Sequence, residues 1–124
     1  MPVNNAALGD WTATADITLE RYAAVMDTNV RALIMLVQAA LPHIPSGGRI
    51  INISGFATRI GPRIPPMPLY IASKIALEGL TQNWAVEFGQ PRGITVNGTK
   101  HQMMSPGSWP SWRVRIVDGS GAAL

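Results

Sequence analysis

Tyr70 and Lys74 are the residues of this sequence whose types and spacing best suit proton transfer. They lie four positions apart at the start of a predicted helix, where positions i and i+4 share one face, so the phenol and the ammonium would project side by side. A nearby cation favours the phenolate and lowers the tyrosine pKa. A tyrosine tuned in this way can give a proton to a carbonyl oxygen or remove one from an alcohol. A chance pairing is the alternative, because tyrosine and lysine occur at this spacing in many helices.

Two predicted helices must position this pair and its surroundings. The first begins at Asp16 or Thr18, either of which can cap it, and is closed by prolines. Apolar residues recur along it at helical spacing, and the polar trio at 27–29 competes for backbone groups, which predicts a local kink. The second helix runs from about residue 70 to 88 and ends at Gly89.

Two short apolar strands alternate with these helices. Residues 49–54 and 94–97 are rich in β-branched side chains, which is typical of buried parallel strands. A proline-rich loop, residues 55–69, follows the first of them. The order helix, strand, helix, strand predicts an α/β layer with right-handed crossovers. Residues 98–124 carry no period and are expected to be irregular.

Further landmarks surround the tyrosine and the lysine in a fixed order along the chain. They are Val-Asn-Asn-Ala-Ala at 3–7, Asn-Val-Arg at 29–31, Gly-Arg-Ile-Ile-Asn-Ile-Ser at 48–54, the helix motif at 70–81 and Arg-Gly-Ile-Thr-Val-Asn at 92–97. With all of them in register, the chain resembles the short-chain dehydrogenase/reductase family over nearly the whole stretch from Val3 to Asn97.

The resemblance implies a fold and an activity. The expected fold is α/β, a partial Rossmann-like, doubly wound parallel sheet, in which residues 1–97 form the C-terminal half of a short-chain dehydrogenase domain and residues 98–124 a divergent tail. The activity it implies is hydride transfer between NADP or NAD and a small-molecule carbonyl or alcohol substrate. The ketoacyl-carrier reductases are the nearest general likeness.

The resemblance also assigns roles to single residues. Tyr70 would be the catalytic acid and base, and Lys74 would hold the nicotinamide ribose hydroxyls and lower the Tyr70 pKa. Asn29 would keep a water in the proton relay through its backbone carbonyl, although a simple polar defect of the helix would explain the same residue. Asn4, with its neighbour Asn5, would brace the sheet beside the cofactor.

The catalytic serine is where this sequence departs from the family. The family usually reads Asn-Ile-Ser-Ser, whereas this chain has Gly55 in the slot of the second serine. Side chains alternate along a strand, so Ser54 should point away from that slot. A shifted loop could bring in Ser54, or else Thr58, as the catalytic hydroxyl. A milder departure is Ala7, where the family has glycine.

The family's phosphate-binding element is a strand, a glycine-rich turn and a helix, and no glycines of this sequence match it. We therefore expect a chain truncated at the cofactor-binding half, for which enzymatic activity is an open question. The alternative function is that of an inactive fragment or pseudoenzyme acting through association. In the family the two long helices commonly form a dimer interface, and a homo-oligomer could use the apolar residues Leu33, Leu36, Val37, Leu80 and Trp84. The alternative is that most of these residues face the core of the chain itself.

Composition excludes several other classes of function. A chain of 124 residues has room for one small domain, and the absence of cysteine excludes disulfides and thiol nucleophiles. Two distant histidines predict no metal site. The net charge of +3 comes from scattered single cations, without the basic run of a nucleic-acid-binding protein. There is no signal-peptide pattern, and the apolar run at 32–37 is too short for a membrane span, so we expect a cytoplasmic protein.

Overall fold

The computed structural model describes residues 1–55 and 66–101, the side chains of Lys100 and His101 excepted. Thr58 and most of the proline-rich loop lie outside the described residues, as do the last 23 residues of the chain, 102–124.

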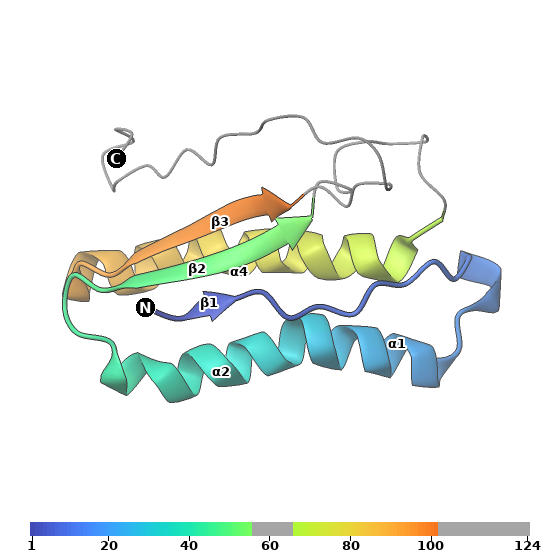
Figure 1. The fold of residues 1–124 in the computed structure, drawn as a ribbon, viewed down its shortest axis with the longest axis horizontal. Coiled ribbons are helices and arrows are strands. Elements are labelled where there is room, and N and C mark those ends of the chain that lie inside the picture. Colours follow the sequence, from blue (N-terminus) through green and yellow to red (C-terminus); the bar gives the residue numbers. More distant parts are fainter. Residues whose placement is uncertain (56–65, 102–124) are drawn as a thin grey trace.

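A three-stranded parallel sheet forms one layer of the molecule (Figure 1). Its order is β1 (Val3–Asn4), β2 (Arg49–Gly55) and β3 (Thr95–His101), with Ile51 of β2 aligned between Val3 and Asn97. The predicted parallel α/β arrangement is confirmed. The strand predicted to end at residue 97 continues through 98–101, however, because it pairs with β2 along its whole length. The expectation of irregular chain from residue 98 onward is wrong for these four residues.

The first helical segment is continuous but changes its geometry in the middle. It consists of α1 (Leu19–Met26), the π-helical turn η2 (Asp27–Arg31), α2 (Ala32–Ala40) and the short 3-10 turn η3 (Leu41–His43), and a further 3-10 turn η1 (Thr14–Asp16) precedes it. Thr18 caps α1 by accepting a hydrogen bond from the Arg21 backbone N–H at 3.1 Å. The local distortion predicted at the polar trio is present, in the form of the π-helical turn.

Helix α4 (Pro68–Arg92) is longer than predicted. It runs past Gly89, through Pro91, and ends at Gly93, which has a φ of 62°. Pro91 cannot donate a backbone hydrogen bond, and it lies one residue before the end of the helix. The left-handed conformation of Gly93 then closes the helix, which is the role that the sequence had suggested for Gly89.

The two long helices pack on the same face of the sheet and contact each other. Alternate residues of β2 are buried: Ile50, Asn52 and Ser54. The main apolar cluster draws on both helices and the sheet: Val37, Ile44, Ile50, Trp84, Phe88, Ile94 and Val96. The side chains of Asn29 and Ser73 join the helices directly through a hydrogen bond of 3.0 Å. The π-helical turn and α4 are thereby joined to each other.

The continuous helix from Leu19 to His43 is long and apolar enough to cross a membrane by length and composition, with a mean hydropathy of 1.3 over its most apolar window. Counting only the uninterrupted apolar run at 32–37 hides this property. The helix nevertheless buries Val25, Leu33 and Val37 against the rest of the molecule. The buried share of that window is 22%.

Candidate active site

Tyr70 and Lys74 lie on the first two turns of α4, and both are buried, with exposed fractions of 7% and 2%. The Lys74 Nζ stands 5.7 Å from the centre of the Tyr70 ring. The same Nζ donates a hydrogen bond of 2.9 Å to the backbone carbonyl of Ile53, near the end of β2. The helix thus presents the phenol and the ammonium side by side, as predicted, and the lysine ties them to the sheet.

Burial dominates the electrostatics of this pair. Desolvation raises the pKa of the Tyr70 phenol and lowers the pKa of the Lys74 ammonium, because a low-dielectric surrounding disfavours the charged form of each. The sequence had suggested that Lys74 would pull the Tyr70 pKa down. That expectation is wrong for the chain by itself, since spacing reveals the neighbouring cation but not the depth of burial. Tyr70 is therefore a neutral phenol at neutral pH.

Gly55 faces the pair from the end of β2. A Cβ placed on Gly55 would lie 3.1 Å from the Tyr70 Oη and 3.2 Å from its Cε1, closer than ordinary contact. It would also meet the Lys74 Cγ at 3.4 Å. The slot inferred for the missing serine therefore adjoins the tyrosine hydroxyl, and any side chain there requires the ring to move.

Ser54 is not brought to this group. Its Oγ donates a hydrogen bond of 2.9 Å to Glu78 Oε1, one turn beyond Lys74 on α4. Ser54 and Gly55 meet different turns of α4: Ser54 bonds Glu78, whereas a Cβ on Gly55 would meet Tyr70 and Lys74. Ser54 thus does not supply the hydroxyl that Gly55 lacks, and its companion candidate Thr58 lies outside the described residues.

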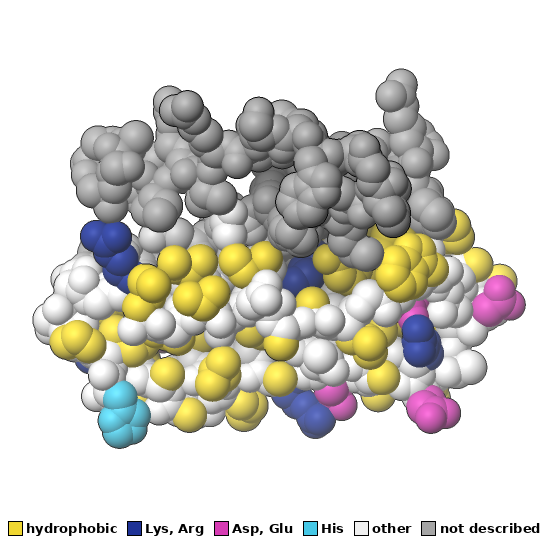
Figure 2. Space-filling view, in the orientation of Figure 1, with side chains coloured by type: hydrophobic (Ala, Val, Ile, Leu, Met, Phe, Trp, Pro, Cys, Tyr) yellow, Lys and Arg dark blue, Asp and Glu magenta, His cyan; other side chains and the backbone are white. Residues whose placement is uncertain are grey.

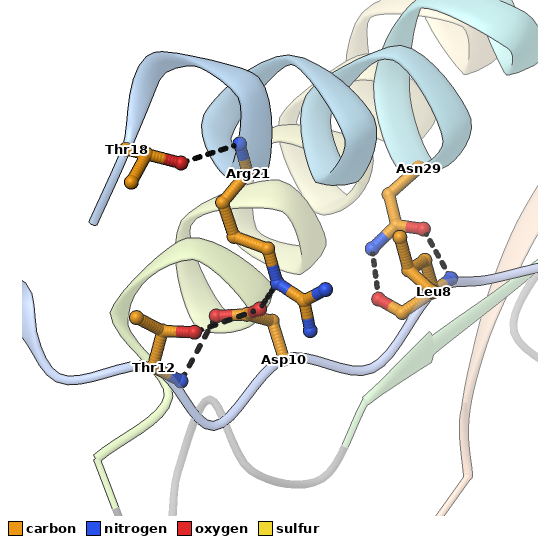
Figure 3. A network of polar contacts seen from close by, with 6 residues as sticks. All are labelled: Leu8, Asp10, Thr12, Thr18, Arg21 and Asn29. Carbon is orange, nitrogen blue, oxygen red and sulfur yellow. Dashed lines mark hydrogen bonds and ion pairs between the residues drawn. The ribbon is translucent and has the colours of Figure 1, made fainter. Parts of the chain in front are cut away.

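Asn29 sits at the centre of the π-helical turn and is fully buried. Its amide makes a closed pair with the backbone of Leu8, accepting from N at 2.7 Å and donating to O at 2.9 Å (Figure 3). It also donates to Ser73 Oγ at 3.0 Å. The side chain therefore joins the loop after β1 to α4. The suggested water relay through the Asn29 carbonyl stays a prediction.

Asn4 braces the sheet, in line with its predicted structural role. Its Nδ2 donates to Asn52 Oδ1 at 2.7 Å, and Asn52 in turn donates to Thr81 Oγ1 on α4 at 2.8 Å. The Oδ1 of Asn4 is buried and has no hydrogen-bond partner in the described part of the chain. An acceptor in this state is costly unless a donor reaches it, so it marks a place for a further group beside β1.

The sequence alone did not reveal a further set of contacts, here called the Asp10 clamp, that holds the loop after β1. The buried carboxylate of Asp10 pairs with the Nε of Arg21 and accepts hydrogen bonds from the Thr12 backbone N–H at 3.1 Å and the Thr12 hydroxyl at 3.2 Å (Figure 3). Desolvation raises the Asp10 pKa, but these hydrogen bonds outweigh it and leave the pKa below its ordinary value. No local pattern links Asp10 to Arg21, because a turn and a 3-10 helix separate them.

The described residues fit one end of a nicotinamide dinucleotide. Lys74 is a buried ammonium with three donors, and Ile53 O is the one acceptor found for it among residues 1–55 and 66–101. Ribose hydroxyls would satisfy the remaining donors. These ranges contain no strand, glycine-rich turn and helix of the kind that receives a pyrophosphate. The fit therefore concerns the ribose and nicotinamide end.

Known proteins similar to this chain agree with this geometry. A family model described as Enoyl-(Acyl carrier protein) reductase matches residues 1–108. The short-chain dehydrogenase/reductase FrzI of Cladobotryum sp is 45% identical over 95 residues, which are 77% of this chain and 36% of that protein. The hydroxynaphthalene reductase arp2 of Aspergillus fumigatus is 35% identical over 112 residues, or 86% of this chain and 40% of that protein. The chain thus spans well under half the length of these relatives.

Solved structures give the same result at the level of the fold. A dehydrogenase/reductase from Sinorhizobium meliloti 1021 superposes with a TM-score of 0.75 at 38% identity, covering 81% of this chain and 39% of that one. A short chain dehydrogenase from Burkholderia cenocepacia J2315 in complex with NADP gives 0.72 at 44% identity, with coverages of 77% and 38%. The landomycin C-6 ketoreductase LanV with bound NADP and rabelomycin gives 0.71 at 38% identity, again with coverages of 77% and 38%.

The raised Tyr70 pKa can be measured directly, because Tyr22 is the only other tyrosine of the chain. In the Tyr22→Phe variant, tyrosinate absorbance should report Tyr70 alone and give a pKa above the ordinary value of about 10. Circular dichroism across the same pH range checks that the chain stays folded. A pKa below the ordinary value would mean that the Lys74 charge, and not burial, controls the phenol.

The Asp10 clamp predicts a pH dependence of stability. A carboxyl whose pKa is lowered by folding stabilises the fold above its ordinary pKa, and this contribution is lost as the pH falls toward the lowered value. We expect the free energy of urea unfolding to decrease from about pH 6 to about pH 3, and the decrease to be smaller in Asp10→Asn. Asp27→Asn removes only the exposed pair with Arg31 and should keep the wild-type slope. Equal slopes in all three proteins would contradict the assignment.

Proposed function

The chain belongs to the short-chain dehydrogenase/reductase family, and from this premise we propose that it supplies the acid–base half of an NAD(P)-dependent carbonyl reductase site. The observation that carries the proposal is the buried Tyr70–Lys74 pair at the carboxyl end of β2, facing Gly55. In open α/β sheets, ligands bind outside the carboxyl ends of the strands. The pair therefore lies where substrate and cofactor would meet.

Tyr70 is in the protonation state that carbonyl reduction requires, because burial keeps the phenol neutral. A neutral phenol gives its proton to the carbonyl oxygen of the substrate as negative charge develops there. Lys74 then stabilises the phenolate, because its ammonium lies 5.7 Å from the ring centre. The reduced nicotinamide cofactor, when bound, supplies the hydride. Its ribose hydroxyls would accept hydrogen bonds from Lys74, and Asn4 would hold the sheet beside it.

NADP is the cofactor that we propose for this site, with a small ketone as the substrate. The support is the NADP found with the Burkholderia cenocepacia dehydrogenase and with the ketoreductase LanV, whose folds this chain shares. Gly55 limits the catalytic power of the site, because it offers no hydroxyl to the developing oxyanion. Loss of one such donor lowers the rate on the order of a hundredfold or more.

A second function, self-association without catalysis, is favoured by the apolar residues that the two long helices expose. Met35 and Leu36 on α2 are about half exposed, at 51% and 50%, and Val86 on α4 is 68% exposed. Figure 2 shows separate hydrophobic side chains along the visible side of the α1–α2 helix, with charged side chains among them toward α1. Such surfaces mark association sites when they are contiguous.

Cofactor binding tests the first function. Calorimetric titration of the whole chain with NADPH should give saturable binding, weakened roughly tenfold or more in Lys74→Met, since a hydrogen bond from a charged donor is lost. Tyr70→Phe should bind NADPH as the wild type does but lose the oxidation of NADPH by ketones, followed at 340 nm. Absence of NADPH binding by the folded chain would overturn the proposal.

Light scattering tests the second function. We expect the chain to have twice the monomer mass and to shift toward the monomer in Leu36→Lys. Gln38→Lys is the matched control, because it adds the same charge to an exposed position of the same helix without removing an apolar contact. A wild-type monomer, or equal dissociation by both variants, would rule out association through the Leu36 surface.

A further inference from the structure

We infer that Ser73 is a positioning residue for Tyr70, linking the first turn of α4 to the π-helical turn through Asn29. The inference rests on the proposed role of Tyr70 as the proton donor. Ser73 does not touch the reacting atoms, and in a sequence it is simply one of the three residues between the tyrosine and the lysine.

The Ser73 hydroxyl is fully buried and makes two hydrogen bonds. It donates to the backbone carbonyl of Tyr70 at 2.7 Å and accepts from Asn29 Nδ2 at 3.0 Å. The Asn29 amide uses its other N–H on Leu8 O at 2.9 Å and its oxygen on Leu8 N at 2.7 Å. An unbroken line of hydrogen bonds therefore runs from the Leu8 backbone to the Tyr70 backbone.

This line of hydrogen bonds determines which atom of each group donates and which accepts. Both N–H bonds of the Asn29 amide are occupied, so the amide cannot flip without breaking the pair with Leu8 (Figure 3). Ser73 must then use its single proton on Tyr70, because Asn29 offers it a donor. Removal of the hydroxyl leaves a fully buried N–H of Asn29 without this partner and releases the Tyr70 carbonyl from one of its restraints.

The first turn of α4 needs such a restraint from inside the helix. Met67, which precedes the helix, provides no side-chain hydrogen bond to cap it. Gly55, which faces the Tyr70 ring, has no side chain with which to hold it. The position of the ring accordingly depends on the backbone of this turn, and Ser73 is the side chain bound to that backbone at Tyr70 itself.

The chain contains a matched control for this arrangement. Thr81, two turns further along α4, donates from Oγ1 to the backbone carbonyl of Leu77 at 2.7 Å and accepts from Asn52 Nδ2 at 2.8 Å. Thr81→Val and Ser73→Ala therefore each remove a buried hydroxyl bonded to a helix carbonyl and to a buried asparagine amide. Only the Ser73 variant changes a bond to Tyr70.

The experiment measures the pKa of Tyr70 by tyrosinate absorbance in the Tyr22→Phe background, where it is the only phenol. Ser73→Ala should lower this pKa toward its ordinary value, because a loosened ring becomes more hydrated, whereas Thr81→Val should leave it unchanged. If Ser73→Ala does not fold, Ser73→Cys replaces it, since a thiol keeps the volume but is a weak donor. We expect the same direction of change.

An unchanged Tyr70 pKa in the Ser73 variant would overturn the inference. An equal shift in Thr81→Val would do so too, because it would show that any buried hydroxyl of α4 has this effect through stability alone. The measurement needs neither cofactor nor turnover. If NADPH does not bind, the proposed function is overturned, but the pKa measurement still decides whether Ser73 positions Tyr70.

Discussion

The Lys74 ammonium, buried against the carbonyl of Ile53, is the constraint on which the arrangement of this molecule depends. A charge that is 2% exposed is expensive unless hydrogen bonds compensate for it. The compensation found here is the hydrogen bond to the backbone near the end of β2. A shift of the helix along the sheet would therefore leave the charge without this partner. The position of Tyr70, one turn earlier on the same helix, follows from this contact.

Two buried asparagine–hydroxyl links extend the same principle along α4. Asn29 binds Ser73 near the start of the helix, and Asn52 binds Thr81 two turns later. A polar group in an apolar interface has few acceptable partners, so each link permits one register of the helix. Apolar packing around Trp84 and Phe88 stabilises the contact of α4 with the sheet further along the helix. Apolar contacts alone are less selective about the register of the helix.

The sequence was sufficient for features that depend on local pattern. Spacing placed Tyr70 and Lys74 on one helix face, and β-branched runs located β2 and β3. The features that it did not reveal depend on three-dimensional burial or on distant partners. The end of α4 at Gly93, instead of Gly89, depends on the contacts of the last turn. The Asp10–Arg21 pair and the hydrogen bond from Asn29 to Ser73 join segments that no spacing rule connects. The direction of the Tyr70 pKa shift depends on how deeply the phenol is buried.

Gly55 and the raised pKa of Tyr70 can be understood as one property of the site. A hydroxyl at position 55 would lie beside the phenol, and a donor in that place would stabilise the phenolate and lower the pKa. With glycine there, the ring approaches the strand so closely that a Cβ would stand 3.1 Å from its oxygen, and burial raises the pKa of the phenol. Position 55 thus offers no hydroxyl, and the phenol beside it stays protonated at neutral pH. One residue therefore accounts both for the missing donor and for the close approach of the ring to β2.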